Sequence, residues 1–161
     1  MKKLYQTGVA LLAAALLSPS AWAGEGPKGH SHDEAFSAGE PGNPKKPARI
    51  VQVTMGEMDG KMVFMPAKVE VKKGEQVRFV LRNNGELDHE FILATTAENL
   101  KHGEAMKKNP DMEHDDPNGK RLAPKKADEI VWKFTKAGEF EYSCLIAGHR
   151  EAGMVGTIVV K

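Results

Sequence analysis

Short apolar stretches separated by turn residues constrain the fold of this chain more than any other feature. From residue 49 onward, each stretch is about four to seven residues long and tends to alternate apolar with polar side chains, the period of a half-buried strand. Gly, Pro and an Asn-Asn-Gly sequence interrupt them, and we find no internal repeat and no strand–helix–strand alternation. Eight strands are expected, at residues 49–55, 62–65, 68–71, 76–82, 89–94, 129–134, 139–143 and 156–160.

This pattern predicts an all-β fold: a two-sheet antiparallel Greek-key β-sandwich with seven to eight strands in about 115 residues. One longer polar stretch, residues 97–119, interrupts the series of strands. Its composition predicts a loop that contains at most one helical stretch, near residues 98–107, because Pro110, Pro117 and Gly119 would interrupt a longer helix.

The N-terminus carries the pattern of a secretory signal peptide. Lys2 and Lys3 give a positive start, residues 9–17 are apolar, and residues 21–23 (AWA) match a cleavage pattern. The alternative, an N-terminal helix or membrane anchor, fits less well because the apolar run is too short to span a bilayer. We therefore expect residues 1–23 to be removed, which makes this an exported, periplasmic protein with no membrane span after cleavage.

Residues 24–47 separate the leader from the first expected strand. They are rich in Gly, Pro, Ser and charge, with almost no apolar content, which predicts a flexible tail. The folded domain is therefore expected to cover residues 48–161. Over the whole chain 23 basic residues balance 22 acidic ones, and this formal charge of +1 argues against a nucleic-acid-binding surface.

The chain has a single cysteine, Cys144, so a disulfide within the chain is excluded. A free thiol is a liability in an oxidising compartment. Cys144 is therefore expected to be buried and inert, paired with another chain, or bound to a metal.

Potential metal ligands surround this cysteine. Cys144, His149 and Met154 follow one another at the spacing C-x4-H-x4-M, and His89 opens an earlier strand directly after a turn. One thiolate and two imidazoles with a weak thioether form the ligand set of a type 1 copper site. Ligands on one compact loop are preorganised for the metal. Zinc fits less well, since its sites usually have a further thiolate or hard ligand.

At these residues the sequence resembles a known family, the cupredoxins, which include plastocyanin and azurin. The resemblance covers residues 48–161 and rests on residues 71–75 (VKKGE) before a strand, on His89 and on the loop from Cys144 to Met154. It implies one bound type 1 copper, with His149 as the port for electrons. The ligands implied are His89, Cys144, His149 and Met154.

Each of these residues also has a purely structural interpretation. Cys144 would be a small buried apolar residue, Met154 would fill the core, and His149 would be a surface histidine in a Gly-rich loop. Taken together, these interpretations predict a metal-free module of the same fold that binds a partner. The joint order of the residues, next to a strand, favours the metal site.

Two features depart from the family pattern. Glu90 follows the first histidine, where many cupredoxins have an Asn or Ser that links the two ligand loops. The spacing C-x4-H-x4-M resembles the type 1 loop of multicopper oxidases, but Ser143 and Leu145 flank Cys144 where those oxidases have histidines. A single cysteine also excludes a binuclear copper site of the terminal-oxidase kind. The chain is therefore expected not to be an enzyme.

Methionine and histidine outside the main set exceed what an electron carrier needs. Four methionines at residues 55, 58, 62 and 65 fit either the core of a hairpin or a thioether site for Cu(I). An H-x-H pair in the tail and part of the long polar loop are candidates for auxiliary copper. Their residues are His30, His32, Met106, Met112 and His114.

The predicted function combines these features. We expect a monomeric periplasmic copper protein that acts in one-electron transfer, in copper tolerance by binding or oxidising Cu(I), or in both. A periplasmic redox partner such as a c-type cytochrome or an oxidase would dock on the apolar residues around His149, unless these only pack the loop. These residues are Leu145, Ile146, Ala147 and Ala152.

Overall fold

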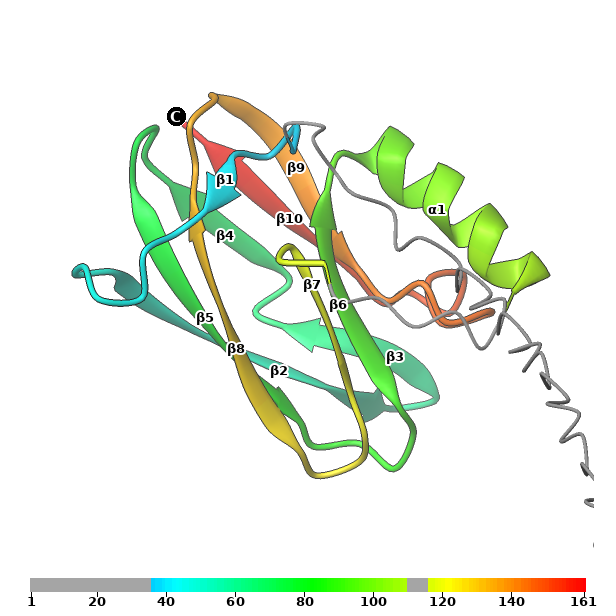
Figure 1. The fold of residues 1–161 in the computed structure, drawn as a ribbon. Coiled ribbons are helices and arrows are strands. Elements are labelled where there is room, and N and C mark those ends of the chain that lie inside the picture. Colours follow the sequence, from blue (N-terminus) through cyan, green and yellow to red (C-terminus); the bar gives the residue numbers. More distant parts are fainter. Residues whose placement is uncertain (1–35, 110–115) are drawn as a thin grey trace, which may run out of the picture. The chain divides into compact units, whose positions relative to one another are not determined.

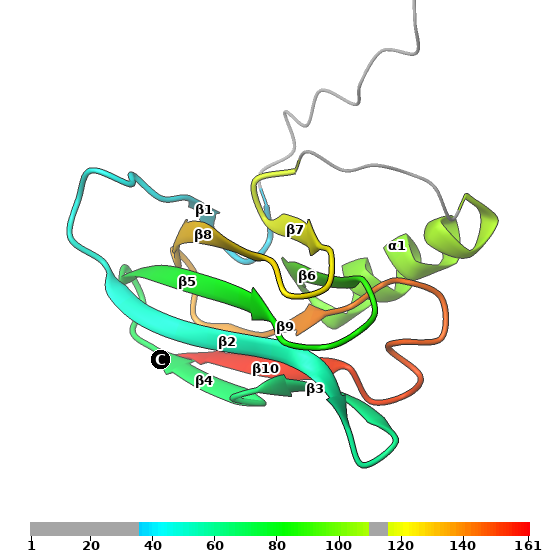
Figure 2. The ribbon, with the colours of Figure 1, turned by 90° about the horizontal axis from the view of Figure 1, so that it is seen from below.

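The computed structural model describes residues 36–109 and 116–161, which form two facing β-sheets with one helix at their side (Figures 1 and 2). In the described part of the chain, none of the helices has the length and apolar character needed to cross a membrane. The predicted leader, residues 1–23, and residues 24–35 of the predicted tail lie outside the described residues.

Each sheet has five strands. The first has the order β1 (Glu40–Pro41), β8 (Ala127–Lys133), β5 (Gln76–Asn83), β2 (Arg49–Met58) and β3 (Lys61–Met65). The second has the order β4 (Lys68–Val71), β10 (Val155–Val160), β9 (Gly138–Ser143), β6 (His89–Ala94) and β7 (Gly119–Leu122).

The all-β sandwich is confirmed, and all eight expected strands are present. The described residues add two short strands, β1 and β7, and the sheets are mixed: β2 pairs with β5, and β4 with β10, in parallel. The parallel pairs arise because the chain leaves β3 for β4 in the other sheet and then returns to place β5 beside β2. Apolar alternation has the same period in either orientation, so it could not identify these partners.

The helical stretch expected in the polar segment is helix α1 (Thr96–Lys108). It begins with a capping box, in which the Thr95 side chain accepts a hydrogen bond from the Glu98 amide and Glu98 accepts one from the Thr95 amide. Met106 on this helix is buried with Ile92 and Leu145, so α1 packs against β6 and the chain that follows β9. The helix therefore covers the part of the molecule that holds Cys144.

Aromatic side chains fill the space between the sheets. Phe91 and Tyr142 stack with ring centroids 5.0 Å apart, and Phe64 contacts both rings edge-on. The four methionines of the β2–β3 hairpin divide between the two sides of the sheet. Met55 is fully buried and Met62 packs against the core, whereas Met58 and Met65 are exposed. The hairpin interpretation is thus confirmed for Met55 and Met62.

The part of the predicted tail that the structure describes packs on the domain. Phe36 contacts the Trp132 ring edge-on at 5.3 Å, and Trp132 Nε1 donates to the Ala38 carbonyl at 3.2 Å. Strand β1 then pairs with the edge of β8. Packing on the domain therefore begins at least twelve residues before residue 48. Residues 24–47 are mostly polar, so their overall composition did not reveal that Phe36 and Ala38 contact the core.

Replacing Gly156 by Ala is expected to lower the free energy of unfolding by about 1–3 kcal/mol. A Cβ atom at this position would lie 2.1 Å from Cε2 of Tyr142, the residue directly opposite in β9. The ring is buried, and its hydroxyl donates to the Pro66 carbonyl at 2.5 Å, which restricts its movement. Denaturant unfolding of the purified protein measures the effect.

Gly103→Ala is the matched control. A Cβ atom there meets only Cδ2 of Leu145, at 3.9 Å, and the position lies inside α1. This variant is expected to gain up to about 1 kcal/mol because Ala favours helix more than Gly. Equal stability changes in the two variants would contradict the close contact of Gly156 with Tyr142.

Candidate metal centre

The structure brings the predicted ligands to one end of the second sheet. His89 is the first residue of β6, and Cys144 directly follows β9. His149 lies in the loop between β9 and β10, and Met154 directly precedes β10. His89, Cys144 and Met154 are fully buried, and His149 is 8% exposed.

Three of the four side chains place donor atoms around one point. His89, Cys144 and His149 each offer an atom within 4.8 Å of the others. Nδ1 of His149 lies 3.3 Å from Cys144 Sγ and 3.3 Å from Nδ1 of His89. Donors that bind one metal at about 2.0–2.3 Å stand a few ångströms apart, so this spacing suits a shared ion.

The backbone of the β9–β10 loop holds these positions. The Cys144 amide donates to the Met154 carbonyl at 3.2 Å, and the Met154 amide donates to the His149 carbonyl at 3.1 Å. Gly148 and Gly153 have φ of 87° and 101°, the left-handed region that glycine adopts without strain. Sequence and turn geometry together therefore place Met154 beside Cys144 at the base of the loop.

Glu90 links the two ligand segments in an unexpected way. Its amide donates to Cys144 Sγ at 3.3 Å, and Oε2 of its buried carboxyl has no hydrogen-bond partner among the described residues. The two ligand segments are therefore linked through the backbone amide of Glu90. Burial raises the pKa of the Glu90 carboxyl.

The thiol and the imidazoles lie in a poorly solvated site. Burial raises the pKa of the Cys144 thiol to about 12, although the Glu90 amide opposes this shift. Burial, followed by the neighbouring His89, lowers the pKa of His149. At neutral pH the site thus holds a protonated thiol and a neutral His149, and a metal ion would displace the thiol proton on binding.

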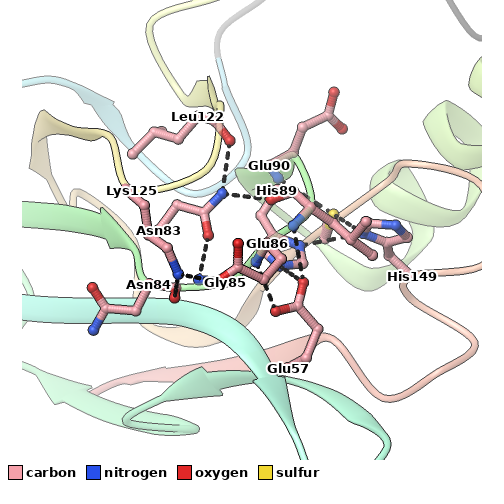
Figure 3. Close-up of polar contacts among 12 residues, drawn as sticks. Glu57, Asn83, Asn84, Gly85, Glu86, His89, Glu90, Leu122, Lys125 and His149 are labelled. Carbon is pink, nitrogen blue, oxygen red and sulfur yellow. Dashed lines mark hydrogen bonds and ion pairs between the residues drawn. The ribbon is translucent and has the colours of Figure 1, made fainter.

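Glu57 on β2 is a neighbour of the site that the sequence analysis missed. Its Oε1 lies 3.1 Å from Nε2 of His89, whereas Nδ1 of the same ring faces His149 (Figure 3). Partial burial alone would raise the pKa of Glu57, but amide hydrogen bonds from Glu86 and Leu87 outweigh it and keep this pKa below its ordinary value. One signal was available: Glu57 continues the inward-facing series of Val51, Val53 and Met55.

An ion pair between half-buried Arg150 and buried Glu141 holds the loop to its neighbours. Arg150, next to His149, donates through Nη2 to both carboxylate oxygens of Glu141, at 2.9 and 3.0 Å. Thr96 at the start of α1 and Ser143 at the end of β9 also donate to Glu141, each at 2.9 Å. This pair, also missed from the sequence, connects the loop to both β9 and α1.

The other predicted metal residues are not part of this cluster. Met106 is buried against Ile92 and Leu145, whereas His30, His32, Met112 and His114 lie outside the described residues. The residues of the predicted docking patch differ in their exposure to solvent. Leu145 is buried beneath α1, while Ile146 is half-buried and Ala147 is exposed.

The donor set fits copper. Two imidazoles and one thiolate with a neighbouring thioether are the ligands of a type 1 copper site. The described residues supply the first three within bonding reach of a shared point, and Met154 is tied by its backbone to two of them. Three side chains from two separate segments thus place donor atoms around one point, and the backbone of Met154 adjoins them.

Comparison with known proteins agrees with this reading. The sequence model of a family described as copper binding proteins, plastocyanin/azurin family, matches residues 51–161. The copper-resistant cuproprotein CopI of Rubrivivax gelatinosus is 49% identical over 132 residues, covering 82% of this chain and 78% of that relative. CopI of Pseudomonas aeruginosa is 35% identical over 160 residues, covering 81% and 85%. The solved structure of auracyanin B has a TM-score of 0.61 at 21% identity, covering 77% of this chain and 96% of that one, which shows the shared fold.

Proposed function

Because this chain belongs to the plastocyanin/azurin family of copper-binding proteins, we propose that it is an exported copper-tolerance protein with one type 1 copper. The ligands would be His89, Cys144, His149 and Met154. The observation that carries the proposal is the buried cluster of two imidazoles and a thiol around one point. The copper-resistant relatives, which share up to 49% of their aligned residues with this chain, support the tolerance role.

Each residue of the proposed copper site would have its own role. Bound copper would supply a one-electron Cu(I)/Cu(II) couple. Cys144 would bind as a thiolate, stabilised by the Glu90 amide, and the histidines would bind as neutral imidazoles. Burial keeps water away, and the loop hydrogen bonds hold the ligands in one arrangement for both oxidation states. Such a site binds Cu(I) tightly and exchanges an electron with little movement.

One-electron transfer to a periplasmic partner is the second candidate function. Half-buried Ile146 and exposed Ala147 lie in the same loop as His149. A small apolar surface beside a ligand suits a weak and transient encounter with a c-type cytochrome or an oxidase. Oxidation of Cu(I) for tolerance would use the same surface to pass the electron on, so the two functions are compatible.

The residues beside Cys144 do not support activity of the multicopper oxidase kind. The neighbours of Cys144 are Ser143 and Leu145, and neither can ligate further copper as a flanking histidine would. We therefore propose a monomeric binding protein without a catalytic cluster. Export to the periplasm follows from the leader pattern of residues 1–23.

In a copper-sensitive bacterial strain, the full chain is expected to raise the tolerated copper concentration severalfold, and a His149→Ala variant is expected to give no protection. The reason is that loss of one imidazole leaves the buried donor set incomplete. Growth over a copper series measures the effect, with immunoblots of the periplasmic fraction to verify export.

The same assay separates the candidate functions. Joint replacement of His30, His32, Met112 and His114 should reduce protection if auxiliary copper sites serve tolerance, and should change nothing in a pure electron carrier. An exported wild-type chain that gives no protection would contradict the tolerance role and favour electron transfer. Lys107→Met, at a solvent-exposed position of α1, is the control that should protect as well as wild type.

A further inference from the structure

Glu57 occupies a position from which it can act on the first histidine ligand. It lies near the end of β2, in the hairpin with β3, and belongs to the opposite sheet from His89. Figure 3 shows its carboxylate directed at the imidazole of His89, with His149 on the other side of that ring. The contact joins Oε1 of Glu57 to Nε2 of His89 at 3.1 Å.

The carboxylate is itself held in place by two backbone N–H groups. Oε2 accepts a hydrogen bond from the Glu86 amide at 3.0 Å, and Oε1 accepts one from the Leu87 amide at 3.2 Å as well as facing His89. The turn that carries these amides is organised by buried Asn83. Its amide group donates to the carbonyls of Leu87 and Leu122, and its oxygen accepts from the Gly85 amide.

This arrangement determines which nitrogen of His89 carries the proton. An ionised carboxylate only accepts hydrogen bonds, so Nε2 of His89 must be the N–H that faces Glu57. Nδ1 then presents its lone pair to the side of Cys144 and His149. Imidazole ligands whose other nitrogen donates to a carboxylate are oriented by it and become stronger donors to the metal.

We propose that Glu57 is a positioning residue of the copper centre, which fixes the tautomer and orientation of His89 and favours Cu(II) over Cu(I). This inference rests on the proposed copper site. Its second part follows from charge: a carboxylate next to the imidazole stabilises the more highly charged ion. Glu57 would thus set how readily the centre gives up its electron, without binding the metal.

The first experiment uses copper-free protein labelled with ¹⁵N. Long-range ¹H–¹⁵N spectra report the tautomer of each histidine. In the wild type, His89 is expected in the Nε2–H form, and in Glu57→Ala it should become a mixture of tautomers. An unchanged Nε2–H form in Glu57→Ala would overturn the role of Glu57 in fixing His89, whatever the metal does.

The second experiment measures Cu(I) and Cu(II) affinities by chelator competition in wild type, Glu57→Gln and Glu86→Gln. Removal of an outer partner of a ligand typically costs about 10–100-fold in metal affinity. Glu57→Gln is expected to lower the Cu(II) affinity by at least about tenfold and the Cu(I) affinity by less. The reduction potential should rise accordingly.

Glu86→Gln is the matched control, because it removes the same charge from the turn whose amides hold Glu57. Its side chain is 80% exposed and pairs with Lys125. It should leave the ratio of the two affinities unchanged. Equal ratios in the Glu57 and Glu86 variants would overturn the proposal while leaving the proposed copper site intact. A wild type without a thiolate-to-copper absorption band would instead refute the copper site itself.

Discussion

A Cys144→Ser variant is expected to fold but to lose the intense thiolate-to-copper absorption completely. Serine supplies no thiolate, and its hydroxyl does not ionise near neutral pH. The loss of Cu(I) affinity should exceed about 100-fold, the upper range for removing an outer partner of a ligand. Visible absorption and chelator competition on the wild type and the variant measure both effects.

The fold of this variant should survive because the substitution changes only one buried atom. Cys144 Sγ accepts a hydrogen bond from the Glu90 amide, and a serine oxygen can accept the same bond. Denaturant unfolding of both copper-free proteins provides the control for structure. A variant that keeps the absorption band would show that the coloured site does not contain Cys144.

An Arg150→Met variant is expected to lower the free energy of unfolding by about 3–5 kcal/mol. Removing the guanidinium leaves the Glu141 carboxylate buried, with only the hydroxyls of Thr96 and Ser143 as partners. The Glu141 side chain is 7% exposed, so water compensates little. Unfolding of copper-free protein by denaturant measures the loss. Because Arg150 adjoins His149, the variant should also release copper faster.

Lys107→Met is the matched control for this change. Lys107 pairs with Glu104 and Glu151, but its side chain is largely solvated. Exposed ion pairs contribute little to stability, so this variant should resemble the wild type. A similar, small effect of both substitutions would mean that the Arg150–Glu141 pair does not hold the ligand loop.

The strands could be predicted because half-buried strands leave a period of two in the sequence. All eight expected strands are present, and most of their inward positions are apolar, as in β5, where Val77, Phe79 and Leu81 are fully buried. Strand β1 has only two residues, and the four residues of β7 (GKRL) do not alternate apolar with polar side chains. Their pairing depends on neighbours supplied by distant parts of the chain, β8 and β6.

The candidate ligands could be predicted because their chemistry is rare and their spacing is local. Cys144, His149 and Met154 lie on one loop, and only His89 had to be placed from elsewhere. The supporting residues could not be found in this way. Glu57 in one sheet contacts His89 in the other. Arg150 lies in the loop that follows β9 and pairs with Glu141 of β9 itself. Charged residues are common, so only tertiary contacts distinguish these from the rest.

Titration of the purified, leader-free protein with Cu(II), followed by visible absorption and electron paramagnetic resonance, tests the copper centre most directly. One type 1 copper held by His89, Cys144, His149 and Met154 predicts an intense thiolate-to-copper band that saturates at one equivalent, together with a matching single-copper resonance signal. Further equivalents should bind without adding to that band. Absence of a thiolate-to-copper band at any ratio of copper to protein would contradict the site.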